Sequence, residues 1–202
     1  MPSPQYDKLV RDIATARRIT YSVPAHACST TIHELKVKSY IFMSHAIIEE
    51  YLETIAMHVA DQALEQLVKH STLTTAAVGL ISSGIIGRVE EDGTISKKLK
   101  REPFEDIPLF LTTAYGRFKS VVSKNNGIKN DDQLKLLLPI GVDPAVEDSA
   151  TMAALDSFGG KRGAIAHEFK ISKTHTLSEI DGDLATIRTG LLTYDSACLA
   201  RI

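Results

Sequence analysis

Apolar residues recur at helical spacing over two long stretches of the chain. The first stretch begins near Thr31, and no proline or glycine interrupts it until Gly79. The second lies near the C-terminus. Intervals of three, four or seven residues place the side chains on one face of an α-helix. The first stripe consists of Ile41, Ile48, Leu52, Ile55, Val59, Ala63 and Leu67, and the second of Ile180, Leu184, Ile187, Leu191, Tyr194 and Cys198.

Capping boxes mark where both helices begin. Thr31 is followed by Glu34 at the first start, and Thr176 by Glu179 at the second. In this pattern the hydroxyl and the carboxylate accept hydrogen bonds from backbone N–H groups that have no partner within the helix. A first helix that continues to about Lys69 is roughly 60 Å long. That length favours a helical bundle or a dimer-forming protein over a compact mixed α/β domain.

Shorter helices are predicted between the two long ones. Few segments alternate with a period of two residues, so strands are not expected. Gly159 and Gly160 are expected to interrupt or kink the helix that starts at about Ser149. The predicted fold is therefore all-α, an antiparallel helical bundle with a long early helix. The shorter helices cover 74–87, 105–124, 131–138 and the segment from 149, with a turn at 90–93 and a basic connector at 96–101.

The composition suits one globular domain. With 44% apolar and 24% charged residues, the chain resembles soluble globular proteins and shows no sign of disorder. We assign residues 1–30 to an N-terminal extension, helical and packed on the bundle, and residues 31–202 to the helical domain itself. No internal repeat is present.

Charge, cysteine content and hydropathy exclude several classes of protein. The net charge of −2 gives no overall attraction to a polyanion, so any contact with nucleic acid has to come from a local basic patch. Cys28 and Cys198 are too few for a disulfide framework or a zinc site, which favours a reduced, cytoplasmic setting. The N-terminus lacks the pattern of a signal peptide, and the longest apolar run, 76–86, is too short to span a bilayer. No membrane contact is expected.

Common cofactor and metal motifs are absent from the sequence. It contains no Walker A loop, no glycine pattern for dinucleotides and no G-x-S-x-G elbow. Its histidines form no H-E-x-x-H pair. The sequence therefore predicts neither a cofactor nor a metal ion.

Arg162 and His167 form an R-x4-H pattern shortly before the last helix. Internal cleavage of RNA requires removal of a proton from the 2′-hydroxyl and delivery of one to the leaving 5′-oxygen. A histidine that titrates near neutral pH can do either. A guanidinium group fits the oxygens of the phosphate as negative charge builds up on them. The two residue types suffice for this chemistry.

The residues around this pattern resemble those of the HEPN superfamily, in particular HEPN domains of the RiboL-PSP type. Similar segments are Leu136–Gly141, Gly160–His167 and, in the early helix, Ser44–Leu52, and the similarity covers roughly residues 30–200. The resemblance implies an antiparallel helical bundle, a two-fold dimer and cleavage of RNA without a metal ion. Arg162 matches the arginine of the family motif, and His167 matches its histidine.

Two positions depart from patterns in that family. Gly163 stands where a polar residue, often asparagine, usually follows the arginine, so no supporting hydrogen bond is expected from this position. Some HEPN toxins carry a tyrosine two residues after the histidine, and an attached nucleotidyltransferase antitoxin modifies its hydroxyl. Phe169 has no hydroxyl, which disfavours that route of neutralisation. We expect Phe169 to pack into the core.

The spacing of the motif limits how one chain can use it. Five residues along a continuous α-helix rotate by about 140° and advance by about 7.5 Å, so Arg162 and His167 cannot lie side by side there. Either the backbone deviates near Gly160 or Gly163, or two copies of the chain build one site across a two-fold axis. The resemblance to HEPN domains favours the second arrangement.

The motif residues and their neighbour Lys161 can instead have purely structural roles. His167 can be an ordinary helix histidine, Lys161 a solvated lysine, and Arg162 one half of an ion pair. The carboxylates available for that pair are Glu49, Glu50 and Glu53.

The sequence predicts a homodimeric, metal-independent endoribonuclease, with a toxin or defence nuclease as the biological setting. Its substrate is RNA, and an antitoxin or another protein is a further partner to consider. The alternative is a catalytically silent HEPN-like module that binds a partner or RNA without cutting it. A site in which Arg162 and His167 converge in an open cleft favours the enzyme.

Overall fold

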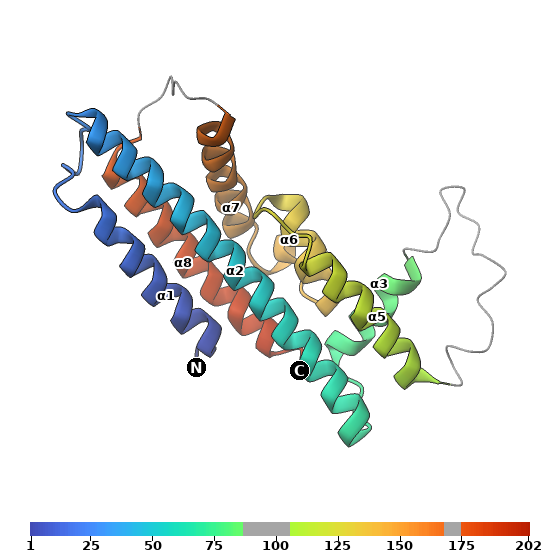
Figure 1. The fold of residues 1–202 in the computed structure, drawn as a ribbon. Helices are drawn as coiled ribbons and strands as arrows, with labels where there is room; N and C mark the ends of the chain where they lie inside the picture. The colour runs from blue at the N-terminus through green and yellow to red at the C-terminus, as the bar shows by residue number, and fades with distance from the viewer. Residues whose placement is uncertain (87–105, 168–174) are drawn as a thin grey trace.

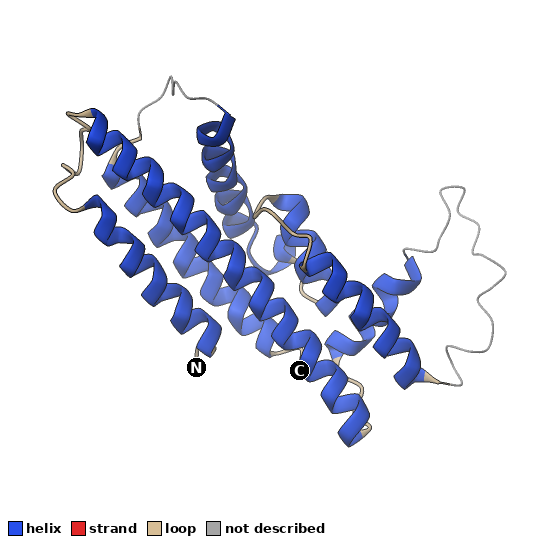
Figure 2. Ribbon diagram, in the orientation of Figure 1, coloured by secondary structure: helices blue, strands red, loops and turns tan. Residues whose placement is uncertain are grey.

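The computed structural model describes residues 1–86, 106–167 and 175–202, with backbone alone at 84–86 and at His167. Over these residues the chain forms seven α-helices, two short 3-10 helices and no strand (Figure 2). The predicted all-α fold is confirmed. The turn at 90–93, the basic connector at 96–101 and the packing of Phe169 lie outside the described residues. Within them, no helix combines the length and apolar character needed to cross a membrane.

The longest helices lie side by side, and the shorter ones gather along α2 (Figure 1). α1 and α7 run opposite to α2 and α8, and α7 packs against α8 and α2. α3, α5 and α6 each contact α2 as well. The elements are α1 (Pro4–Ala16), η1 (Arg17–Thr20), α2 (Thr31–His70), α3 (Thr75–Ile86), α5 (Ile107–Val122), α6 (Asn130–Leu137), η2 (Leu138–Ile140), α7 (Pro144–His167) and α8 (Leu177–Leu199).

α2 is continuous over 40 residues, as the apolar stripe predicts. At about 1.5 Å per residue it is about 60 Å long. The hydroxyl that caps it belongs to Thr30 and not to Thr31, because Thr30 has extended backbone angles and its side chain accepts a hydrogen bond from the His33 N–H at 3.2 Å. The stripe from Ile41 to Ala63 is buried.

α8 follows its sequence pattern closely. Thr176 and Glu179 form the predicted capping box, in which each side chain accepts a hydrogen bond from the other residue's backbone N–H. All six residues of its stripe, from Ile180 to Cys198, are buried. α8 therefore buries one face against α7, α2 and α1.

α7 bends at Asp148 and not at the glycine pair. Asp148 has extended backbone angles, and its carboxylate accepts hydrogen bonds from the N–H groups of Ala150 and Thr151, both at 3.1 Å. It thus caps a second helical segment that starts at Ser149, where a helix start is predicted. The backbone stays helical through Gly159 and Gly160, so the expected interruption there is wrong. Two glycines weaken a helix, but tertiary packing of α7 on α8 and α2 holds the segment helical.

α3 and η2 approach more closely than a side chain would permit. A Cβ atom on Gly79 would lie 2.8 Å from the carbonyl oxygen of Pro139 and 2.9 Å from the backbone nitrogen of Gly141. The glycine that weakens α3 as a helix therefore allows it to pack against the η2 turn.

A buried hydrogen-bond network fastens the start of α1 to the end of α8. Asp195 is fully buried, and its carboxylate accepts hydrogen bonds from the Ser3 N–H at 2.8 Å and from the Ser3 hydroxyl. It also accepts one from the Tyr51 hydroxyl of α2 at 3.1 Å. Burial and the nearby Asp195 carboxylate raise the pKa of Tyr51, which keeps its hydroxyl protonated as a donor. Three helices thus meet at one carboxylate.

Candidate functional site

Arg162 lies on the face of α7 that meets α2. The residue is half-buried, and its guanidinium carbon lies 5.6 Å from the centre of the Phe42 ring. A cation over an aromatic face is attracted to the negative π-electron density of the ring. Phe42 therefore holds the guanidinium group against α2.

No carboxylate of the described residues neutralises Arg162 directly. Among the described residues, no carboxylate oxygen lies within 4.0 Å of its guanidinium nitrogens. The three candidate partners have other contacts. Glu50 binds Lys8 at 2.9 Å, Glu53 accepts a hydrogen bond from an asparagine amide at 2.9 Å, and Glu49 lies beside a histidine. The ion pair considered for Arg162 is not formed.

His45 and Glu49 lie one turn apart on α2, near Arg162. The Nδ1 atom of His45 is 3.5 Å from a carboxylate oxygen of Glu49, and the His45 side chain is only 5% exposed. Burial lowers the pKa of His45 to about 4; the Arg162 cation acts in the same direction and Asp132 opposes it. The imidazole is therefore neutral at pH 7, and its contact with Glu49 is not a charged ion pair.

The pKa of Glu49 is raised, whereas a pair with a cation would lower it. Burial raises its pKa, the Glu53 carboxylate adds to the rise, and Arg162 opposes it. The charge of Arg162 thus acts to lower the pKa of both Glu49 and His45, although neither side chain forms a hydrogen bond or an ion pair with Arg162. We call Arg162, Phe42, His45, Glu49 and Asp132 the Arg162 cluster.

The structure does not bring positions 162 and 167 together. α7 is regular from Ser149 to His167, so the two positions lie about 140° apart around the helix axis. Gly160 and Gly163 have helical backbones, which excludes a local deviation as the way to join Arg162 and His167. Position 167 ends the helix, and its side chain lies outside the described part of the chain.

Other candidate residues have structural contacts. Lys161 forms an ion pair with Asp183 of α8 and is therefore not available for a phosphate. No role at this site was predicted for His45 or Asp132. Only the i, i+4 spacing of His45 and Glu49 indicated that these two side chains share a face of α2.

Metal-binding side chains do not gather in the described residues. No group of three or more histidine, cysteine, aspartate or glutamate side chains is placed there to hold a metal ion. Cys28 is partly exposed and Cys198 is buried, and both are free thiols.

We expect His45 to make the protein less stable as the pH falls from 7 to 5. Its pKa is lower in the folded chain than in the unfolded chain, so the unfolded chain binds more protons between about pH 6.5 and 4. The loss at pH 5 is about 2 kcal/mol relative to pH 7. Urea unfolding at both pH values should show that His45→Gln removes this loss. Replacing His58 on the same helix with glutamine should leave it unchanged, and an identical pH dependence in His45→Gln would contradict the assignment.

Comparisons with known proteins found no relative of this chain. No family model matches the chain, and neither a curated protein nor a solved structure matches it. The likeness to HEPN domains therefore depends on the R-x4-H segment, on Leu136–Gly141 and on the sequence of the long early helix.

Proposed function

We propose that the protein is a metal-independent endoribonuclease of the HEPN type that acts as a homodimer. In this reaction a base removes the proton of a 2′-hydroxyl, and the oxygen attacks the adjacent phosphorus. The bond to the 5′-oxygen breaks, and an acid protonates the leaving oxygen. The products are a 2′,3′-cyclic phosphate and a 5′-hydroxyl. His167 carries out proton transfer, and Arg162 binds the phosphate.

One observation carries the proposal: Arg162 is held in place, and no carboxylate in the described ranges neutralises it. The Phe42 ring fixes the guanidinium, and no carboxylate lies within 4.0 Å of it among the described residues. A cation fixed before the substrate arrives stabilises a transition-state charge without the cost of reorganisation. Neighbouring His45 has a pKa of about 4, too low for an efficient acid or base near neutral pH. Proton transfer is therefore assigned to His167.

The register of α7 allows two His167 positions to approach each other, while Arg162 stays on the face of α7 that packs on α2. Positions 160, 163 and 167 fall on the same half of the helix, away from Arg162. A Cβ atom on Gly160 or Gly163 would meet no described atom within 4 Å, so no described residue packs closely on these two glycines. Small residues permit close approach of another helix. Two α7 helices that meet here bring their His167 positions close to one two-fold axis.

The acidic residues near Arg162 favour a second candidate, a catalytically silent HEPN-like module. Glu49, Glu53 and Asp132 contribute negative charge around the Arg162 cluster. Negative charge disfavours a polyanion such as RNA. In that case the same surface binds a protein partner. The toxin or defence role follows from the resemblance alone, and a silent module would need a second protein to carry it out.

An assay of RNA cleavage in excess EDTA tests the proposal. We expect the purified wild-type protein to cut single-stranded RNA under these conditions and to leave cyclic phosphate ends. Cleavage abolished by EDTA and restored by a divalent cation would replace the proposed mechanism with a metal-dependent one. A well-folded protein that cuts none of a diverse RNA pool would favour the silent module.

A further inference from the structure

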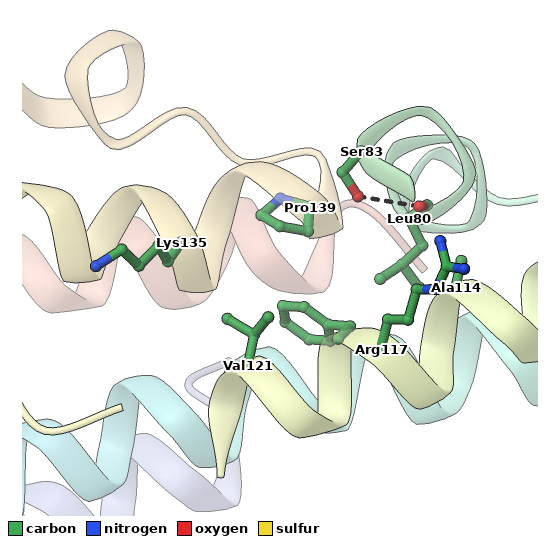
Figure 3. Close-up of a pocket in the computed structure, with 8 residues that line it drawn as sticks. Leu80, Ser83, Ala114, Arg117, Val121, Lys135 and Pro139 are labelled. Atoms are coloured by element: carbon green, nitrogen blue, oxygen red, sulfur yellow. Dashed lines mark hydrogen bonds between the residues drawn. The ribbon is translucent and has the colours of Figure 1, made fainter. Parts of the chain in front are cut away.

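A cavity of about 350 Å³ opens between α3, α5 and the turn from α6 into η2. Its wall is mostly apolar (Figure 3). The apolar lining residues are Leu80, Ala114, Phe118, Val121 and Pro139. This volume lies at the lower end of the range for small-molecule sites. The cavity is separate from the Arg162 cluster and uses none of its residues.

Arg117 supplies the charge at this cavity. Its guanidinium extends from α5 towards the turn of α3 that carries Leu80 (Figure 3). Among the described residues, Arg117 forms no ion pair and no hydrogen bond. Lys135, also part of the lining, has only a 3.8 Å contact with Asp132. The cavity thus combines an apolar wall with an exposed cation that has no ion-pair partner in the described part of the chain.

The polar groups of the wall are few. The Ser83 hydroxyl donates its hydrogen bond to the carbonyl oxygen of Leu80 at 2.9 Å, so it has no proton left for a ligand. A nucleobase carries several donors and acceptors that such a wall would leave without partners, at a cost in free energy. An alkyl chain has no such groups. The lining therefore favours a ligand with an apolar body and one anionic end.

We propose that this cavity binds an amphipathic carboxylate of the medium-chain fatty acid class. The alkyl chain lies against Leu80, Phe118 and Pro139, where it is removed from water. The carboxylate meets the guanidinium of Arg117, whose planar fork can donate two hydrogen bonds to it. This site is independent of the proposed cleavage of RNA.

Sodium decanoate, kept below its micelle concentration, is the probe for the test. We expect saturable binding to the full-length chain, with shifts of backbone amide NMR signals in α3, α5 and η2. Arg117→Gln should weaken decanoate binding about tenfold, because a hydrogen-bonded charge pair is lost. Lys119→Gln removes one positive charge from the same helix but does not line the cavity, and it should leave the affinity unchanged. Decanol should bind wild type and Arg117→Gln equally.

Three results would overturn the proposal. The first is the absence of saturable decanoate binding, and the second is amide shifts that lie elsewhere in the bundle. The third is an equal loss of affinity in Arg117→Gln and Lys119→Gln. That result would show that affinity depends on the net charge of α5 and not on a contact with Arg117. Each of these three results can occur whether or not the protein cuts RNA. The test of decanoate binding is therefore independent of the test of RNA cleavage.

Discussion

His167→Ala is expected to lower the rate of RNA cleavage by a factor of about 10²–10⁴, the usual effect of removing one acid–base group. Arg162→Ala should produce a loss of similar size, because the transition-state phosphate then lacks its fixed cation. Single-turnover rates on one RNA, measured in excess EDTA, provide the comparison. The effect on rate should far exceed any effect on folding.

The structure gives a reason why Arg162→Ala should fold. Arg162 has no ion pair to lose among the described residues, and its contact with Phe42 is worth about 0.5–2 kcal/mol. Urea unfolding should therefore show a small change in stability. Arg11 on α1 and His70 at the end of α2 are both exposed, so Arg11→Ala and His70→Ala are matched controls that should cut RNA at the wild-type rate. Undiminished cleavage by both site variants would point to a contaminating nuclease.

Asp195→Ala is expected to lower the free energy of unfolding by about 3 kcal/mol. The carboxylate is fully buried and accepts hydrogen bonds from Ser3 and Tyr51, so its removal leaves buried donors without this partner. Urea unfolding followed by circular dichroism at 222 nm measures the loss. Because Ser3 begins α1, backbone amides of α1 should also exchange hydrogen faster in the variant.

Controls separate this network from a general effect of charge. Asp12→Ala removes a carboxylate of α1 that forms a surface ion pair with Lys8 at 2.8 Å, and it should change stability by less than about 1 kcal/mol. In a double-mutant cycle, Tyr51→Phe should cost less in the Asp195→Ala background than in wild type. Additive losses, or a loss of less than about 1 kcal/mol in Asp195→Ala, would show that the network does not fasten α1.

The long helices could be predicted because local and tertiary preferences agree along them. In α2 and α8 the apolar stripe, the polar faces and the absence of proline point to the same structure, and burial follows the stripe. The position of the Thr30 cap depends on which of two adjacent threonines has extended backbone angles. Sequence pattern cannot distinguish the two hydroxyls.

The course of α7 shows where such prediction fails. The glycine pair predicts a weak point, yet packing keeps Gly159 and Gly160 helical. The bend falls at Asp148, where the carboxylate of the cap provides partners for backbone N–H groups. Helix propensity is a small free energy per residue, and tertiary contacts of α7 outweigh it.

The Arg162 cluster could be predicted only in part. The motif identified Arg162, and the spacing of five residues correctly indicated that positions 162 and 167 face different ways on a continuous helix. The neighbours of Arg162 come from α2 and α6, and their proximity depends on how these helices pack against α7. The low pKa of His45 has the same origin, because burial of its side chain arises only in the folded bundle.

The most direct test of the central claim, one RNA-cleaving site built from two copies of the chain, is the activity of mixed dimers. Wild type and His167→Ala are mixed in equal amounts, allowed to exchange subunits, and assayed with EDTA at constant total protein. If one altered histidine inactivates the shared cleft, about one quarter of the wild-type activity remains, because only wild-type homodimers are active. Activity of about one half would mean that each chain works alone. That result would contradict the shared site.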